Sequence, residues 1–87
     1  MDISTLRQRI DDIDARLLEL LTERAQISLE IGEHKRGENQ SISNPEREQK
    51  ILARLLECNR GPLTPDMVRA IYRVIIRSCR DLQHRQV

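Results

Sequence analysis

The fold is decided by residues 3–34, ISTLRQRIDDIDARLLELLTERAQISLEIGEH, which carry one continuous helical pattern. Positions that alternate in steps of three and four residues form a single stripe: Ile3, Leu6, Ile10, Ile13, Leu17, Leu20, Arg24, Ile27, Ile31 and His34. This spacing predicts one long helix with an apolar stripe that packs against other helices. We expect the helix to run from about Ser4 to about Lys35, to be capped by Ser4 or Thr5, and to be broken at Gly37.

Arg24 interrupts this stripe in its middle. A guanidinium stays charged at any working pH, so burying it requires a paired anion. No carboxylate lies within a turn of Arg24 on the stripe itself. Two possibilities stay open: an ion pair with an Asp or Glu from another helix, or a bound anionic ligand.

Two shorter helices are predicted after residue 40. Asn44 as N-cap and Pro45 at the first helical position start the second helix, whose apolar face comprises Ile51, Leu52, Leu55 and Leu56. The stop signal NRGP at residues 59–62 separates it from a third helix that starts at Thr64 and Pro65. The third helix ends near Arg85, and its apolar face comprises Val68, Ile71, Tyr72, Ile75, Cys79 and Leu82. The sequence thus predicts an all-α fold in a single domain, residues 1–87, with helices of long, short and medium length.

The composition argues against several classes of protein. Lys and Arg number 15 against 14 Asp and Glu, and a net charge of +1 argues against a dedicated nucleic-acid surface. Cys58 and Cys79 are too few for a disulfide framework and predict free thiols in a reducing compartment. The sequence shows no signal peptide, membrane-spanning run, metal-ligand spacing, phosphate loop or nucleophile beside a base. We therefore expect a cytoplasmic protein with no metal, cofactor, nucleic-acid or membrane partner.

The length of the first helix predicts how the protein assembles. Its residues span about 48 Å, whereas a compact chain of this length is about 30 Å across. The two shorter helices cannot cover the whole apolar stripe. We expect an intertwined helical homodimer with two-fold symmetry, in which the long helices of two chains pack together.

Three cations of the first helix are candidates for binding a small anion. Lys35 follows Arg24 on nearly the same face, about 16 Å along the axis, with the small Ser28 between them. Arg7 precedes Arg24 by about 25 Å, so it could approach the same anion only from the partner chain of an antiparallel dimer. The alternative is that Arg7 and Lys35 are solvated, Lys35 at a helix C-terminus where a cation is favoured.

The other polar candidates lie on the second and third helices. Asn44, Arg47 and Glu48 stand at a helix N-terminus whose free N–H groups could bind an oxygen-bearing ligand, although a capping role fully explains Asn44. Cys79 and Gln83 lie on or beside the apolar face of the third helix. The alternatives for these two are a small core residue and an exposed glutamine.

The order of these residues along three helices resembles the AroQ-class chorismate mutases, an all-α family. The strings that carry the resemblance are LR at 6–7, IDDID at 10–14, LLTER at 20–24, IGEHK at 31–35, NPERE at 44–48, NRGPL at 59–63, and the run from Ile75-Ile76 to Leu82-Gln83. The resemblance covers essentially the whole chain. It is closest to the mutase domain that bacteria fuse to prephenate dehydratase.

The resemblance implies an isomerase that converts chorismate to prephenate by a Claisen rearrangement, in the biosynthesis of phenylalanine and tyrosine. The family is an intertwined homodimer with two equivalent sites and needs no cofactor. By this resemblance, Arg24 and the partner chain's Arg7 hold the two carboxylates of chorismate. Lys35 and Gln83 donate to the ether oxygen that is released in the reaction.

The resemblance further implies that Glu48, with the backbone near Asn44 and Arg47, fixes the ring hydroxyl, and that Arg47 adds positive charge. Two positions depart from the common pattern: Asn44 stands where the family often has Asp, and Cys79 where a Ser often lines the pocket.

Two other functions remain alternatives to chorismate mutase activity. One is an isochorismate-pyruvate lyase on the same scaffold, and the other is a non-enzymatic helical dimerisation module.

Overall fold

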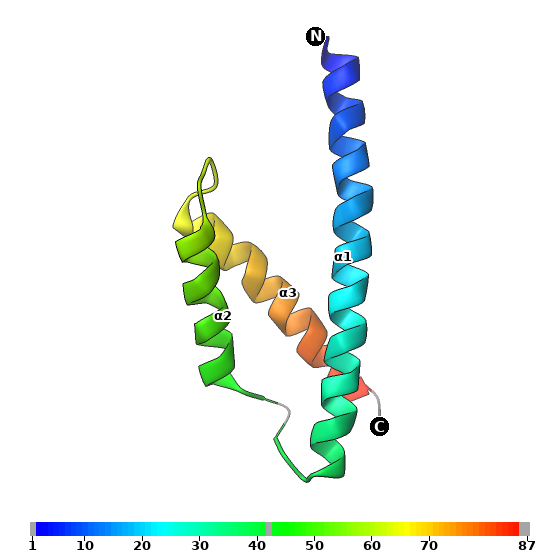
Figure 1. The fold of residues 1–87 in the computed structure, drawn as a ribbon, viewed down its shortest axis with the longest axis vertical. Helices are drawn as coiled ribbons and strands as arrows, with labels where there is room; N and C mark the ends of the chain where they lie inside the picture. Colours follow the sequence, from blue (N-terminus) through cyan, green and yellow to red (C-terminus); the bar gives the residue numbers. More distant parts are fainter. Residues whose placement is uncertain (1, 42, 86–87) are drawn as a thin grey trace.

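Three helices make up the computed structural model, which describes residues 2–41 and 43–85. They are α1 (Ile3–Gly37), α2 (Pro45–Cys58) and α3 (Pro65–Arg85), of long, short and medium length (Figure 1). The described residues include no strand, and none of their helices is long and apolar enough to cross a membrane. The all-α prediction is confirmed.

Short polar side chains start each helix. The predicted caps of α2 and α3 are confirmed, because Asn44 Oδ1 accepts from the Arg47 N–H at 3.2 Å and Thr64 Oγ1 accepts from the Met67 N–H at 3.2 Å. The prediction for α1 is wrong: its cap is Asp2, not Ser4 or Thr5. Asp2 Oδ1 accepts from the Thr5 N–H at 2.8 Å. This backbone hydrogen bond lowers the pKa of Asp2 below its usual value.

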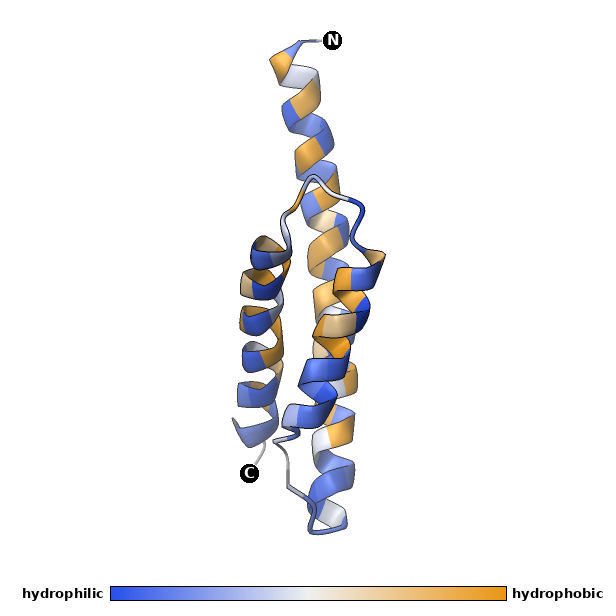
Figure 2. Ribbon diagram, turned by 90° about the vertical axis from the view of Figure 1, so that its left-hand side faces the viewer, coloured by the Kyte–Doolittle hydropathy of each residue, from blue (hydrophilic) through white to orange (hydrophobic). Residues whose placement is uncertain are grey.

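The helix α3 joins the other two. It crosses the C-terminal half of α1 and also packs against α2 (Figure 1). Within the part of the chain that is described, no Cα atom of α2 lies within 8 Å of a Cα atom of α1. The first turns of α1 extend beyond both shorter helices, which makes the molecule 55 Å long and only 24 Å by 15 Å across (Figure 2).

The most buried side chains belong to α3: Val68, Ile76, Cys79 and Gln83. Two details differ from the expected apolar face. Ile71 is 46% exposed, and Ile76, which the pattern did not single out, is buried. The crossing with α1 therefore turns inward the face that contains Ile76. Ile71 lies on a second apolar face with Met67 and Val74, which stays open to solvent.

The apolar stripe of α1 is also open to solvent in the single chain. Its exposed members are Ile3, Leu6, Ile10, Ile13, Leu17, Leu20, Ile27 and Ile31. Figure 2 shows these apolar turns continuing into the part of α1 that extends beyond its neighbours. The chain exposes 7229 Å², whereas a compact monomer of this mass exposes about 5,300 Å². One chain alone therefore leaves an unusually large surface uncovered, much of it apolar.

Candidate functional site

A pocket of about 240 Å³ lies where the three helices meet. Its lining residues come from α1, from the start of α2 and from the C-terminal half of α3: Arg24, Ile27, Ser28, Ile31, Lys35, Asn44, Arg47, Glu48, Ile51, Ile76, Cys79, Arg80 and Gln83. Seven of the eight site residues expected from the sequence are among them. The exception, Arg7, lines a separate hollow on the first turns of α1 with Asp2, Asp11 and Asp12.

The α1 wall of the pocket carries two cations. Arg24 and Lys35 lie on one face of the helix with Ser28 between them, as their spacing predicts. Arg24 is half-buried, and its guanidinium makes no hydrogen bond or ion pair with the residues that the structure describes. Among the described residues, no Asp or Glu from another helix forms the ion pair that was the alternative explanation for a charge at Arg24. A charge in this position attracts an anion to the pocket.

Gln83 is buried at the point where α3 crosses α1. Its Nε2 donates to the backbone carbonyl of Ser28 at 2.7 Å, and its own backbone carbonyl accepts from Arg36 Nη1 at 2.8 Å. An amide has two N–H donors, so the bond to Ser28 leaves one N–H for a ligand. The alternative of an exposed, solvated Gln83 is excluded, since 9% of the residue is accessible.

Gly32 makes this crossing possible. It is the only buried residue of the described α1. A Cβ atom added at Gly32 would lie 3.0 Å from Cγ and 3.2 Å from Cβ of Gln83. Any larger residue would thus push against the side chain of a residue that is held by its amide bond to Ser28 and by the bond from Arg36 to its backbone carbonyl. The absence of a side chain at Gly32 sets how deeply Gln83 enters the pocket.

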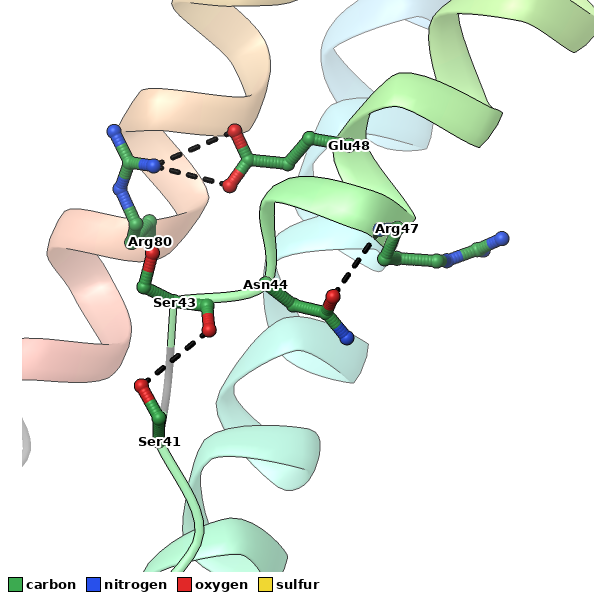
Figure 3. Close-up of polar contacts among 6 residues, drawn as sticks. All are labelled: Ser41, Ser43, Asn44, Arg47, Glu48 and Arg80. Atoms are coloured by element: carbon green, nitrogen blue, oxygen red, sulfur yellow. Dashed lines mark hydrogen bonds and ion pairs between the residues drawn. The ribbon is translucent and has the colours of Figure 1, made fainter.

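The start of α2 forms the opposite wall. The amide oxygen of Asn44 caps the helix by accepting from Arg47, and the Arg47 side chain extends away from Arg80 and Glu48 (Figure 3). The exposed Arg47 guanidinium adds a third cation to the lining. Cys79 is a free, buried thiol on α3 that also lines the pocket.

Arg80 is a pocket residue that the sequence analysis missed. Its Nη1 donates to both carboxylate oxygens of Glu48, at 3.0 Å and 3.4 Å, and so forms an ion pair between α3 and α2 (Figure 3). The signal was present in the sequence, since Arg80 stands three residues before Gln83 and therefore shares a helix face with it. Its partner Glu48 lies on α2, so the pattern of α3 alone could not identify the ion pair.

Comparisons with known proteins decide the family. The family model described as chorismate mutase type II matches residues 6–84. The chain belongs to the chorismate mutase type II family.

A solved structure of a chorismate mutase from Thermus thermophilus superposes with a TM-score of 0.95 at 32% identity, over 97% of this chain and 96% of that one. A bifunctional chorismate mutase/prephenate dehydratase of Pseudomonas aeruginosa is 36% identical over 93% of this chain, which spans only 24% of that protein's length. A chorismate mutase of Methanocaldococcus jannaschii is 28% identical, over 93% of this chain and 83% of that protein. The resemblance recognised in the sequence is confirmed.

The close approach at Gly32 in this chorismate mutase family fold leads to a paired test. Gly32→Ala should lower the thermal midpoint of unfolding, because about 1 kcal/mol of gained helix propensity is outweighed by an overpacking cost of about 1–3 kcal/mol. Gly37→Ala, at the end of the same helix, meets no atom within 4 Å and should be neutral or stabilising. Calorimetry at one protein concentration compares the two. Equal midpoints for the two variants would contradict the proposed crowding of Gln83.

Proposed function

We propose that the chain catalyses the Claisen rearrangement of chorismate to prephenate. The observation that carries the proposal is the Arg24 guanidinium, which has no ion pair among the described residues, in a pocket that also contains Lys35 and a buried Gln83. Family membership supports the substrate, a dianion that matches a pocket rich in cations. The reaction is intramolecular and needs no nucleophile, so positioned cations and hydrogen-bond donors are sufficient for it.

The cations have the first task. Chorismate is flexible, and it reacts only in a compact conformer in which the two carbons to be joined lie close together. Arginine side chains hold carboxylates through paired, charge-assisted hydrogen bonds, and fixing the reactive conformer lowers the entropic part of the barrier. Arg24 takes one carboxylate in this proposal, and Arg47 adds positive charge at the wall formed by α2.

The donors have the second task. Negative charge grows on the ether oxygen as its carbon–oxygen bond breaks. The ammonium group of Lys35 and the second N–H of Gln83 are the candidates to donate to this atom, and the bond from Gln83 to Ser28 holds its amide in a fixed orientation. Donors fixed before the reaction stabilise the transition state more than the ground state.

The second substrate carboxylate needs Arg7 from another chain. Within one chain, Arg7 lies about 25 Å from Arg24 along α1, so it cannot contact the same ligand. The single chain exposes about 1,900 Å² more than a compact monomer of its mass, and this excess includes the apolar stripe of α1, next to which Arg7 follows Leu6. We propose an antiparallel homodimer in which this stripe is covered and each pocket receives the partner chain's Arg7.

A two-substrate assay tests the reaction. We expect chorismate to disappear with formation of prephenate, and isochorismate to release little or no pyruvate. The reverse preference would identify a lyase on the same scaffold, and no reaction with either substrate would favour a dimerisation module.

Lys35 is expected to act mainly on turnover. Lys35→Ala should lower kcat by about 10²–10³-fold, the usual effect of removing one transition-state donor, with a much smaller change in KM. Steady-state kinetics with chorismate measure both constants. A kcat near that of the unchanged protein would rule out Lys35 as a donor to the ether oxygen.

Gln83→Glu tests whether an N–H or O–H donor is needed at this position. A glutamate donates only when it is protonated, and then through a single O–H, whereas its ionised form offers the ether oxygen no donor. The kcat of the variant should therefore rise as the pH falls from 8 to 5, whereas that of the unchanged protein should vary less. A flat profile for Gln83→Glu would contradict the donor role.

Mixing two inactive variants tests the shared site. Arg7→Ala and Arg24→Ala should each lose most activity. In a heterodimer of the two, one site contains both substitutions and the other contains neither, so random re-association should restore about a quarter of the wild-type sites. No recovery after mixing, or a folded monomer in sedimentation at micromolar concentration, would contradict the proposed dimer.

A further inference from the structure

The wall of the pocket that α2 provides approaches α3 more closely than it approaches α1. In the described part of the chain, Cα atoms of α2 lie within 8 Å of Cα atoms of α3 but not of Cα atoms of α1. Yet the first turn of α2 supplies Asn44, Arg47 and Glu48 to the pocket. The placement of these side chains over the pocket therefore depends on how α2 is attached to α3.

The ion pair between Glu48 and Arg80 is a polar attachment at this end of α2. Glu48 points from α2 toward α3, where the Arg80 guanidinium meets both of its carboxylate oxygens (Figure 3). Both side chains are partly buried, at 28% and 34% accessibility. Screening by solvent is therefore weaker than for a fully exposed pair.

The pair also changes the charge that a ligand meets. Among the described residues, four cations and a single carboxylate, that of Glu48, line the pocket. Paired with Arg80, this carboxylate carries little net charge toward the pocket. It still has lone pairs to spare, because an ionised carboxylate offers about four acceptor positions. A paired Glu48 can thus accept a hydroxyl hydrogen without repelling an anion.

We propose that Arg80 is a positioning residue for substrate binding. It holds the Glu48 carboxylate where this group accepts the hydroxyl of a hydroxylated dicarboxylate, and it cancels the repulsion between Glu48 and the two substrate carboxylates. The inference rests on the proposed function for the identity of the ligand. It assigns to Arg80 a role that is exerted through Glu48, without contact between Arg80 and the reacting atoms.

Removal of Arg80 has an unusual consequence under this proposal. In Arg80→Gln, the Glu48 carboxylate faces a dianion without compensation, so binding weakens. A further change of Glu48 to Gln removes the uncompensated charge and should restore binding. If Arg80 only supported packing between α2 and α3, the second substitution could not help.

Two measurements on the full chain test the proposal: the KM for chorismate, and the calorimetric Kd of a hydroxylated bicyclic dicarboxylate that mimics the transition state. Arg80→Gln should raise both by about tenfold, which equals about 1.4 kcal/mol. Arg80→Lys keeps the charge and should stay within about threefold of the unchanged protein. The double variant Arg80→Gln/Glu48→Gln should bind the mimic at least about threefold more tightly than Arg80→Gln alone.

The exposed ion pair on the same helix supplies the control. Arg69 Nη1 lies 2.8 Å from Asp66 Oδ1, outside the pocket lining, and Arg69→Gln should leave KM and Kd unchanged.

Unchanged KM and Kd in Arg80→Gln, or a double variant that binds no better than Arg80→Gln, would overturn the proposed role of Arg80 and leave the proposed function standing. An unchanged protein that binds the mimic but does not convert chorismate would overturn the proposed function while the Kd values still decide the role of Arg80. An unchanged protein that does not bind the mimic would overturn both.

Discussion

The close crossing of α1 and α3 at Gly32 is the contact on which the rest of the molecule depends. It places Gln83 against Ser28, and the two hydrogen bonds of Gln83 and Arg36 join the helices there. Because the described part of α2 lies closer to α3 than to α1, the position of α2 also depends on this crossing. The pocket between the helices is therefore a consequence of one residue that lacks a side chain.

The same helix that builds the pocket leaves most of its apolar stripe uncovered. A sequence that buries so little of its apolar surface gains little hydrophobic stabilisation from folding alone. Covering the stripe with a second copy would supply the missing burial, and in an antiparallel pair it would bring a partner's Arg7 toward the pocket. In the proposed dimer, stability and the completeness of the site therefore have one physical origin.

Local sequence signals predicted the positions of the helices well, but they did not predict the contacts between helices. The periodic stripe located α1, and Asn44 and Thr64 located the starts of α2 and α3, because caps and periodicity act within a few residues. The cap at Asp2 was missed because Ser4 and Thr5, two and three residues later, also carry capping side chains. Ile76 and Arg80 were missed because their surroundings depend on the angle at which α3 crosses its neighbours, which no single helix determines.

The charges of the pocket suggest a division of work in the proposed reaction. Arg24 and Arg47 attract carboxylates that stay charged from substrate to product, so they stabilise the ground state and the transition state to a similar degree. Beyond their part in fixing the reactive conformer, such uniform binding lowers KM but does not raise kcat. Only groups that meet the ether oxygen respond to charge that appears during the reaction. The electrostatic part of the acceleration then comes mainly from Lys35 and Gln83, and for this part the position of the Gln83 amide matters more than the number of cations around it.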